Sequence, residues 1–135
     1  KLLQELKIVN ITANSDVLNV NKIIDNDFAY PSMWAGSGNG TYIQFDIGEP
    51  RIVNRVDLAF YQGTSHSNTI NISVSEDGEH FKILYGGHTV GDTVSYVPFH
   101  VEPAKARYIR VTGFGQRDTG AIYTSITEAK IFGTK

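Results

Sequence analysis

The chain contains no cysteine among its 135 residues. This excludes a disulfide framework and thiol chemistry, but it does not identify a reducing compartment, because many bacterial secreted domains also lack cysteine. No apolar run approaches the roughly 18 residues that a transmembrane helix needs, and no signal peptide is visible. The sequence begins abruptly at KLLQELKIV, so we expect a mature protein or an excised module.

An excess of one charge sign is also missing. The 12 Lys and Arg residues nearly balance the 14 Asp and Glu residues, which leaves a net charge of -2. Because the sequence has no run of Lys or Arg, it offers no basic segment that would bind a nucleic acid or an anionic membrane. The 41% hydrophobic and 19% charged residues are typical of a folded domain. The length suits one module over residues 1–135 rather than two.

Apolar and polar residues alternate with a period of two in several short segments. In INISVS, residues 70–75, the apolar residues alternate with Asn and Ser, which is typical of a half-buried strand, and Asp77-Gly78 then supplies a turn. Residues 1–7 and 20–24 look only mildly helical. Because Gly, Asn, Asp and Ser clusters separate the segments, the sequence predicts an all-β sandwich of the jelly-roll kind. The other predicted strands cover residues 6–13, 41–48, 55–61, 80–85, 93–101, 106–114 and 124–133.

β-Sandwiches of this kind place their functional residues in the loops at their ends, because the residues of the sheets form the buried core. Three loops stand out, over residues 20–39, 62–68 and 114–123. The first contains KIIDNDFAYPSMW, which combines two carboxylates, an aromatic pair and the only tryptophan of the chain.

This acidic loop does not fit an EF-hand. Counting from Asp25, Asp27 takes the third position, but Ala29, Tyr30 and Gly36 take the fifth, sixth and twelfth, where an EF-hand needs an oxygen ligand, Gly and Glu. A catalytic carboxylate pair needs one neutral and one ionised acid with a substrate between them. Two Asp residues in one tight loop do not provide that arrangement.

A calcium site of another kind suits the chemistry better. Ca²⁺ takes about six to eight oxygen ligands, and turns supply backbone carbonyls readily. Asp25, Asp27, the backbone around Lys22 and the Ser32 hydroxyl lie within one loop, and one further carboxylate would complete the cage. The alternative is an Asx-turn in which Asp25 caps local amides.

Five segments in this order resemble the coagulation factor V/VIII C-type (discoidin) superfamily: IIDNDFAYPSMW, YIQFDIGEPRIVNRVDLAF, INISVSEDGEHF, RYIRVTGFG and SITEAKIFG. The resemblance covers about residues 6–133 and is specific to the bacterial branch, the family 32 carbohydrate-binding modules. Vertebrate members carry two Cys residues that close the domain. The absence of Cys here favours the bacterial branch.

The resemblance implies a jelly-roll β-sandwich with one structural Ca²⁺ ion. The family commonly has Asp-Gly-Asp followed by Thr-Arg-Trp, whereas this chain has Asn26 for Gly, Ser32 for Thr and Met33 for Arg. Asn tolerates a left-handed backbone and Ser keeps a hydroxyl, so the calcium hypothesis stands, while the lost Arg removes support at that corner. Carried onto this chain, the ligands are the Lys22 carbonyl, Asp25, Asp27, Ser32 and Glu128.

The other two loops carry the residue types of a sugar site. Such sites pair an aromatic face with forked polar side chains, and a carboxylated sugar adds a need for Arg, Lys or His. In a sandwich of this topology both loops can reach one end. They offer eight candidate side chains: Tyr61, Gln62, His66, Asn68, Phe114, Gln116, Arg117 and Tyr123.

Plainer interpretations stand beside these candidates. His66 also fits a solvated turn, Tyr123 a cap on the core, and Arg117 a surface ion pair with Asp118. Trp34 is assigned to the core, because the family packs the tryptophan after its calcium loop inside. The other histidines, His80, His88 and His100, receive no role, because the sequence shows no carboxylate partner for them.

The overall pattern looks most like modules attached to alginate lyases. It implies a non-catalytic module that targets a parent polysaccharide lyase or glycoside hydrolase to a uronate-containing glycan such as alginate, with His66 and Arg117 facing the carboxylate. A secreted or cell-surface location in a bacterium follows. A neutral, galactose-type ligand stays open.

Two further functions compete with glycan binding. Uronate β-elimination can be run by Tyr and His, but the chain is short for a β-fold lyase and its candidate residues stand on loop tips. A membrane or protein adhesion module would use Phe28 and Tyr30 as apolar spikes, but no basic ring surrounds them.

Overall fold

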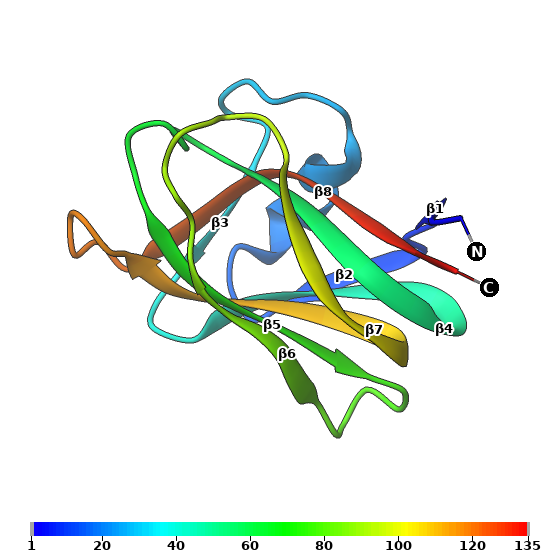
Figure 1. Cartoon of the computed structure of the whole chain (residues 1–135). Helices are drawn as coiled ribbons and strands as arrows, with labels where there is room; N and C mark the ends of the chain where they lie inside the picture. The colour runs from blue at the N-terminus through cyan, green and yellow to red at the C-terminus, as the bar shows by residue number, and fades with distance from the viewer. Residues whose placement is uncertain (1, 135) are drawn as a thin grey trace.

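Eight β-strands and one short 3-10 helix account for the regular structure of residues 2–134, which this computed structural model describes (Figure 1). The predicted all-β class is confirmed. No helix in this range is both long and apolar enough to cross a membrane. In chain order the elements are β1 (Gln4–Leu6), β2 (Asn10–Ala13), η1 (Val17–Ile24), β3 (Trp34–Ser37), β4 (Thr41–Phe60), β5 (Asn68–Ser75), β6 (Lys82–His88), β7 (Val97–Gln116) and β8 (Tyr123–Thr134).

The strands pair antiparallel in the order β1-β8-β4-β7-β5-β6, with β2 added to β4 and β3 added to β8. The long strands β4 and β7 each combine two predicted strands. The pairing of β4 with β7 jumps from Asp46 to Arg51, because Gly48 between them has a φ of 90° and breaks the ladder. Figure 1 shows β4 folding back at this point, so its two halves serve different parts of the sandwich.

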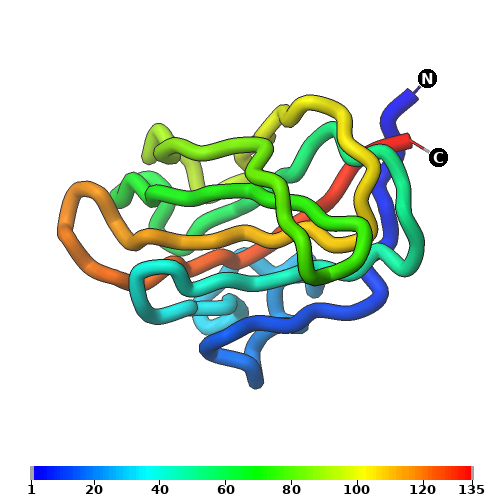
Figure 2. The backbone as a smooth tube through the Cα atoms, turned by 90° about the horizontal axis from the view of Figure 1, so that it is seen from below, coloured from blue at the N-terminus to red at the C-terminus, as the bar shows by residue number. Residues whose placement is uncertain are grey.

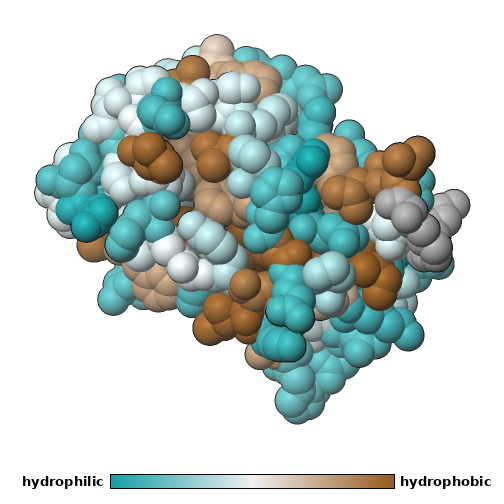
Figure 3. All heavy atoms as spheres, in the orientation of Figure 1, coloured by the Kyte–Doolittle hydropathy of each residue, from teal (hydrophilic) through white to brown (hydrophobic). Residues whose placement is uncertain are grey.

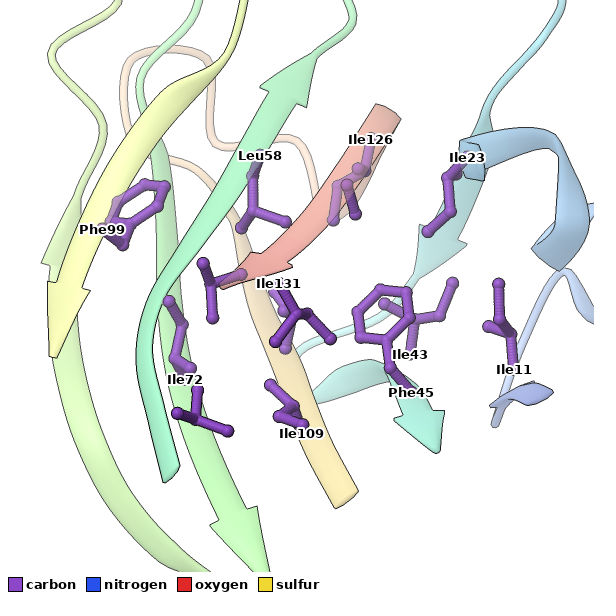
Figure 4. Packing of buried hydrophobic residues seen from close by; sticks show 14 of the residues in the cluster. Ile11, Ile23, Ile43, Phe45, Leu58, Ile72, Phe99, Ile109, Ile126 and Ile131 are labelled. Atoms are coloured by element: carbon purple, nitrogen blue, oxygen red, sulfur yellow. The ribbon is translucent and has the colours of Figure 1, made fainter. Parts of the chain in front are cut away.

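The core follows from the period-two pattern. In β4, Ile43 and Phe45 are fully buried, while the alternate residues Tyr42 and Gln44 are half-buried on the opposite face. Figure 4 shows apolar side chains from β4, β5, β7 and β8 gathered in one shared interior. On the face seen in Figure 3, by contrast, hydrophobic residues lie in small separate patches between hydrophilic ones.

Trp34 is fully buried, so its assignment to the core is confirmed. Its indole Nε1 donates a hydrogen bond of 2.9 Å to the Ser15 carbonyl, which satisfies the polar atom of the buried ring. Trp34 begins β3, a strand that the sequence did not predict. The glycine that follows explains why: a Cβ at Gly36 would lie 2.4 Å from the Trp34 ring, so packing rather than strand propensity selects this residue.

Two helical expectations have different outcomes. The mild helix over residues 1–7 is wrong, because Gln4–Leu6 forms β1 and pairs with β8. The helix over 20–24 exists, but it is a 3-10 helix that already begins at Val17. Each short segment takes the structure that its neighbouring strands impose.

The chain ends and the candidate loops lie at opposite ends of the molecule. Gln4 pairs with Gly133, which brings the described ends of the chain together. The loop over residues 114–123, orange in Figure 2, projects from the other end. The backbone N–H of Arg117 donates to the Ser67 carbonyl at 2.7 Å, so the loop over 62–68 lies beside it.

Candidate functional site

The loops over residues 62–68 and 114–123 form one surface. Besides the backbone hydrogen bond from Arg117, the Ser67 N–H donates to Asp118 Oδ1 at 3.1 Å. Asn68 at the start of β5 pairs with Gln116 at the end of β7, so the pairing of these strands fixes the two loops next to each other. The structure therefore brings the two predicted sugar loops together.

His66 is the centre of a polar cluster on this surface. Its Nδ1 lies 3.3 Å from Asp118 Oδ2, and its Nε2 lies 3.3 Å from Gln62 Oε1. Gln62 has a φ of 52°, a left-handed conformation that turns the chain directly after β4. We refer to Gln62, His66 and Asp118 as the polar cluster.

Asp118 is ionised at neutral pH. Desolvation acts to raise the pKa of this carboxyl, but hydrogen bonds from the Ser67 amide and from His66 outweigh it, so the pKa lies below its usual value. The sequence suggested Asp118 only as an ion-pair partner of Arg117. Among the ion pairs of residues 2–134, the Asp118 carboxylate has His66 and not Arg117 as its partner. Arg117 is exposed next to the polar cluster.

Aromatic side chains lie at the ends of the same two loops that carry the polar cluster. Phe114 and Tyr123 are both exposed, so Tyr123 does not serve as a cap on the core. Tyr61 is half-buried, and its ring centroid lies 5.6 Å from that of Tyr30. The surface thus offers apolar ring faces beside groups that donate and accept hydrogen bonds, the combination that carbohydrate recognition requires.

Two of the predicted contact residues have internal roles. Asn68 is 2% exposed and its N–H donates to Thr89 Oγ1 at 2.8 Å. The expectation that its side chain faces a ligand is therefore corrected: as the first residue of β5 it points into the structure. The Gln116 side-chain carbonyl accepts a 2.7 Å hydrogen bond from the Thr119 hydroxyl, which shapes the loop.

The acidic loop forms a second site. The Ser32 hydroxyl contacts the Lys22 carbonyl at 3.3 Å and also Asp25 Oδ2, while the Asp25 N–H donates to Glu128 Oε2 at 3.2 Å. Four of the five predicted calcium ligands therefore converge. Asn26 has a φ of 61°, a left-handed conformation that asparagine tolerates.

Asp27 joins this group only through its backbone. Its N–H donates to Asp25 Oδ1 at 2.9 Å, and its carboxylate accepts from the Ala29 N–H at 2.9 Å. These are the contacts of Asx-turns, so the turn interpretation and the convergence of ligands coexist in one loop.

Glu128 is the unusual member of the second site. It is 1% exposed, and burial together with the neighbouring Asp25 carboxyl raises its pKa to about 7. Desolvation acts to raise the pKa of Asp25 as well, but hydrogen bonds, first of all from Ser32, lower it below its usual value. No Lys or Arg in residues 2–134 forms an ion pair with Glu128.

The groups around Glu128 fit a hard cation. A buried carboxyl that faces a second carboxylate is stabilised either by protonation or by a bound cation, and the donor set is entirely oxygen, as Ca²⁺ prefers. A hollow of about 170 Å³, lined in part by Asn26 and Glu128, adjoins the site. The Tyr96 hydroxyl donates to Glu128 Oε1 at 3.3 Å, and burial and the charge of Glu128 raise the pKa of Tyr96 to about 12, so this donor stays protonated.

A third cluster lies on the β5–β6 turn. Asp77, Glu79 and His80 place their ligand atoms within 4.8 Å of one another, beside an open hollow of about 510 Å³. His80 does have a carboxylate partner, since its Nδ1 lies 2.7 Å from Asp77 Oδ2, which corrects the sequence expectation. Backbone N–H groups of His80 and Glu79 hold the pKa of Asp77 well below its usual range. These contacts tie the turn together.

Comparison with known proteins agrees with this geometry. A family model described as the F5/8 type C domain matches residues 10–129. This chain belongs to the F5/8 type C family. No curated protein sequence matches it.

Solved structures place the chain among the family 32 carbohydrate-binding modules (CBM32). The CBM32 of AlyQ in complex with 4,5-unsaturated mannuronic acid is 33% identical, with a TM-score of 0.88 over 95% of this chain and 97% of that one. A truncated AlyQ with CBM32 and alginate lyase domains is also 33% identical, with a TM-score of 0.91 over 99% of this chain. A pectin-binding module at 21% identity shares the fold, with a TM-score of 0.81 over 93% of this chain and 91% of that module.

This chain spans 34% of the two-domain AlyQ structure. It corresponds there to the CBM32 and not to the alginate lyase domain. The chain is therefore a carbohydrate-binding module, the non-catalytic part of such an architecture.

Proposed function

We propose that this module binds a uronate-containing glycan such as alginate and targets a parent polysaccharide-degrading enzyme to it. The observation that carries the proposal is the exposed Arg117, which has no carboxylate partner in residues 2–134 and stands beside the polar cluster. A guanidinium recognises a carboxylate through two parallel hydrogen bonds. The AlyQ module bound to an unsaturated mannuronic acid supports the same ligand class.

Each part of the surface has its own task in this proposal. Arg117 binds the sugar carboxylate, and the polar cluster exchanges hydrogen bonds with the ring hydroxyls. Phe114 and Tyr123 pack against the apolar face of the sugar ring. Because the surface is open, affinity for one site is modest, and tethering raises the effective concentration of substrate at a linked catalytic domain.

Calcium is part of the same proposal. The ion would be held by the Lys22 carbonyl, Asp25, Ser32 and Glu128, with Asp27 beside them. When bound, it would supply the positive charge that the buried Glu128 lacks. The hydrogen bonds among these residues hold the loop that follows η1 and orient its segment with Phe28 and Tyr30.

A secreted or cell-surface location in a bacterium, with a lyase or hydrolase linked in the full-length protein, completes the proposal. It rests on the alginate lyase domain that accompanies the CBM32 of AlyQ and on the extracellular place of polysaccharide substrates.

A neutral, galactose-type glycan is the second candidate. Asp118 favours it, because an ionised carboxylate accepts hydrogen bonds from sugar hydroxyls and repels a uronate. The adhesion alternative has less support: the Phe28 ring packs edge-on against Tyr96 at 5.2 Å, so it does not stand out as a spike.

A titration of the module with alginate oligosaccharides, galactose-type sugars and a neutral β-glucan tests the proposal. We expect saturable binding to the uronates and no unsaturated product. Arg117→Ala should weaken uronate binding roughly tenfold, as for a lost charge-assisted hydrogen bond of about 1.5 kcal/mol. Arg51→Ala, near the chain ends, is the matched control. Binding to galactose-type sugars alone, unaffected by Arg117→Ala, would favour the second candidate.

A further inference from the structure

Tyr30 and Tyr61 form an aromatic pair that the proposed function leaves unused. Tyr30 is 68% exposed, more than Phe28, Phe114 or Tyr123. Its ring lies 5.6 Å from that of Tyr61 with an angle of 40° between the planes. The two rings are therefore splayed, and the outer face of Tyr30 is open to solvent.

The aromatic pair is continuous with the polar cluster. Tyr61 directly precedes Gln62, whose side chain contacts His66 at 3.3 Å. The Tyr61 N–H donates to the Ser125 carbonyl at 3.0 Å, which fixes the residue at the end of β4. A ligand seated on the polar cluster therefore has Tyr61 as a neighbour.

Tyr30 reaches this position from the acidic loop. The Ala29 N–H donates to Asp27 Oδ1 and the Ser32 N–H donates to the Ala29 carbonyl at 2.8 Å, so a hydrogen-bonded turn holds Tyr30 on both sides. The pair thus joins two segments separated by 31 residues. It extends the glycan surface beyond the two sugar loops.

We propose that Tyr30 and Tyr61 form a second sugar subsite, which binds the next ring of a glycan whose first ring occupies the polar cluster. This inference rests on the proposed function. A tyrosine ring offers an apolar face to the C–H groups of a sugar, and its hydroxyl stays available to water or ligand. The module then recognises at least two consecutive units rather than a single terminal one.

A sugar fits this pair better than a protein or lipid does. The apolar area is limited to two rings that carry polar tips, which is little for insertion into a lipid bilayer or for the centre of a protein interface. Continuity with a surface that already offers hydrogen bonds to hydroxyls points to a neighbouring unit of the same chain.

The test compares ligand lengths. We measure the affinities of the unaltered module, Tyr30→Ala and Tyr30→Phe for a uronate monosaccharide, disaccharide and trisaccharide. For the unaltered module we expect affinity to rise with length. Tyr30→Ala should bind the disaccharide and trisaccharide roughly tenfold more weakly, if about 50 Å² of apolar contact disappears. Its affinity for the monosaccharide should stay unchanged. Tyr30→Phe should retain the gain, because it keeps the ring.

Phe28→Ala is the matched control, since Phe28 lies in the same loop but packs against Tyr96. Because Tyr30→Ala also removes a contact of the loop, the melting temperature of each variant is measured, and NMR of the unaltered module with each ligand gives an independent readout. The Tyr30 ring signals should shift with the disaccharide and not with the monosaccharide.

Two outcomes overturn the inference and differ from each other. If the unaltered module binds glycans but Tyr30→Ala changes all lengths equally or none, the second subsite is wrong and the proposed function stands. If the unaltered module binds no glycan of any length, the proposed function fails and the subsite fails with it.

Discussion

Both ring nitrogens of His66 are already engaged, one with Asp118 and one with Gln62. A ligand that takes a hydrogen bond from this ring must first displace one of these partners. We therefore expect His66 to act more by holding the polar cluster in shape than by a direct charge contact with a carboxylate. This leaves Arg117 as the cation and Asp118 as the fixed anion of the surface.

The opposite charges of Arg117 and Asp118 give a prediction about specificity. Asp118→Asn keeps the size of the side chain and removes its negative charge. We expect affinity for uronates to stay equal or to rise, because a repulsive charge is lost, and affinity for galactose-type sugars to fall severalfold, because an ionised acceptor is lost. Calorimetric titration with both sugar classes measures the change.

Glu76→Gln is the control for Asp118→Asn, since it removes an exposed carboxylate on the distant β5–β6 turn. Its affinity for both sugar classes should equal that of the unaltered module. A loss of uronate affinity in Asp118→Asn would show that Asp118 contacts the ligand through its charge or positions His66, and it would count against Arg117 as the main determinant.

At the scale of elements, local patterns predicted most of the strands. Alternation of apolar and polar residues, as in β4, indicates which side of a strand faces the core. This pattern can be recognised without knowing which strands pair with each other. β3 escaped prediction because it is four residues long and its Gly36 is chosen by contact with the Trp34 ring. The fusion of two predicted strands into β4 also depends on pairing, which a local pattern does not contain.

The candidate sites also divide into features that a local pattern predicts and features that depend on residues distant in the sequence. The convergence of the acidic loop was predictable because most of its groups lie within one short segment, whereas Glu128 was added from the family resemblance. The partnership of His66 with Asp118 spans 52 residues and the Tyr30–Tyr61 pair spans 31, so neither leaves a local signal. Asn68 was misjudged for a related reason: it is buried where its backbone pairs with β7 and bonds to Thr89 of another loop, partners that are distant in the sequence.

One ion pair between strands gives a prediction about pH. Arg107 of β7 donates to both carboxylate oxygens of Asp46 of β4, at 2.9 and 3.1 Å. The hydrogen bond from Arg107 lowers the pKa of Asp46 below its usual 3.8. The folded state therefore favours the ionised form, so the stabilisation is present above about pH 4 and is lost as the pH falls toward the lower folded-state pKa.

We expect Asp46→Asn to lower the melting temperature by a few degrees at pH 7, and this difference to shrink steadily as the pH falls below about 4. Thermal denaturation across this range measures the effect. Glu49→Gln is the control, because the Glu49–Arg51 pair on the adjacent turn is more exposed and should contribute little at any pH. A difference for Asp46→Asn that does not shrink with falling pH would mean that its cause is packing or the Gly48 turn rather than charge.

At the scale of the whole molecule, the described chain ends and the proposed glycan surface lie at opposite ends of the sandwich (Figure 2). A domain linked near Gln4 or Gly133 would therefore leave the polar cluster and the aromatic pair open to a polysaccharide. The rigid sandwich between them sets a fixed spacing between tether and ligand. This arrangement suits a targeting module.

The proposed calcium site would affect stability through Glu128. Without a cation, this buried carboxylate faces Asp25, and charge in such a place is destabilising. We expect calcium to raise the free energy of unfolding by about 2.7 kcal/mol when free Ca²⁺ is about 100 times its Kd, which is several degrees in melting temperature. Glu128→Gln should melt at the same temperature with calcium or with chelator. Elemental analysis that finds no metal, with no effect of chelator, would remove the calcium assignment.

Removal of calcium should also affect the proposed glycan surface, through Tyr30. The turn that holds Tyr30 begins at Asp27 and ends at Ser32, so loss of calcium should loosen the aromatic pair, whereas the polar cluster is held by hydrogen bonds of its own. We therefore expect chelated module, measured well below its melting temperature, to keep its affinity for a monosaccharide and to lose the gain from a disaccharide. Equal weakening for both ligands would instead mean that metal removal disturbs the whole loop end. No change for either ligand would confine calcium to stability and separate Tyr30 from the metal loop in function.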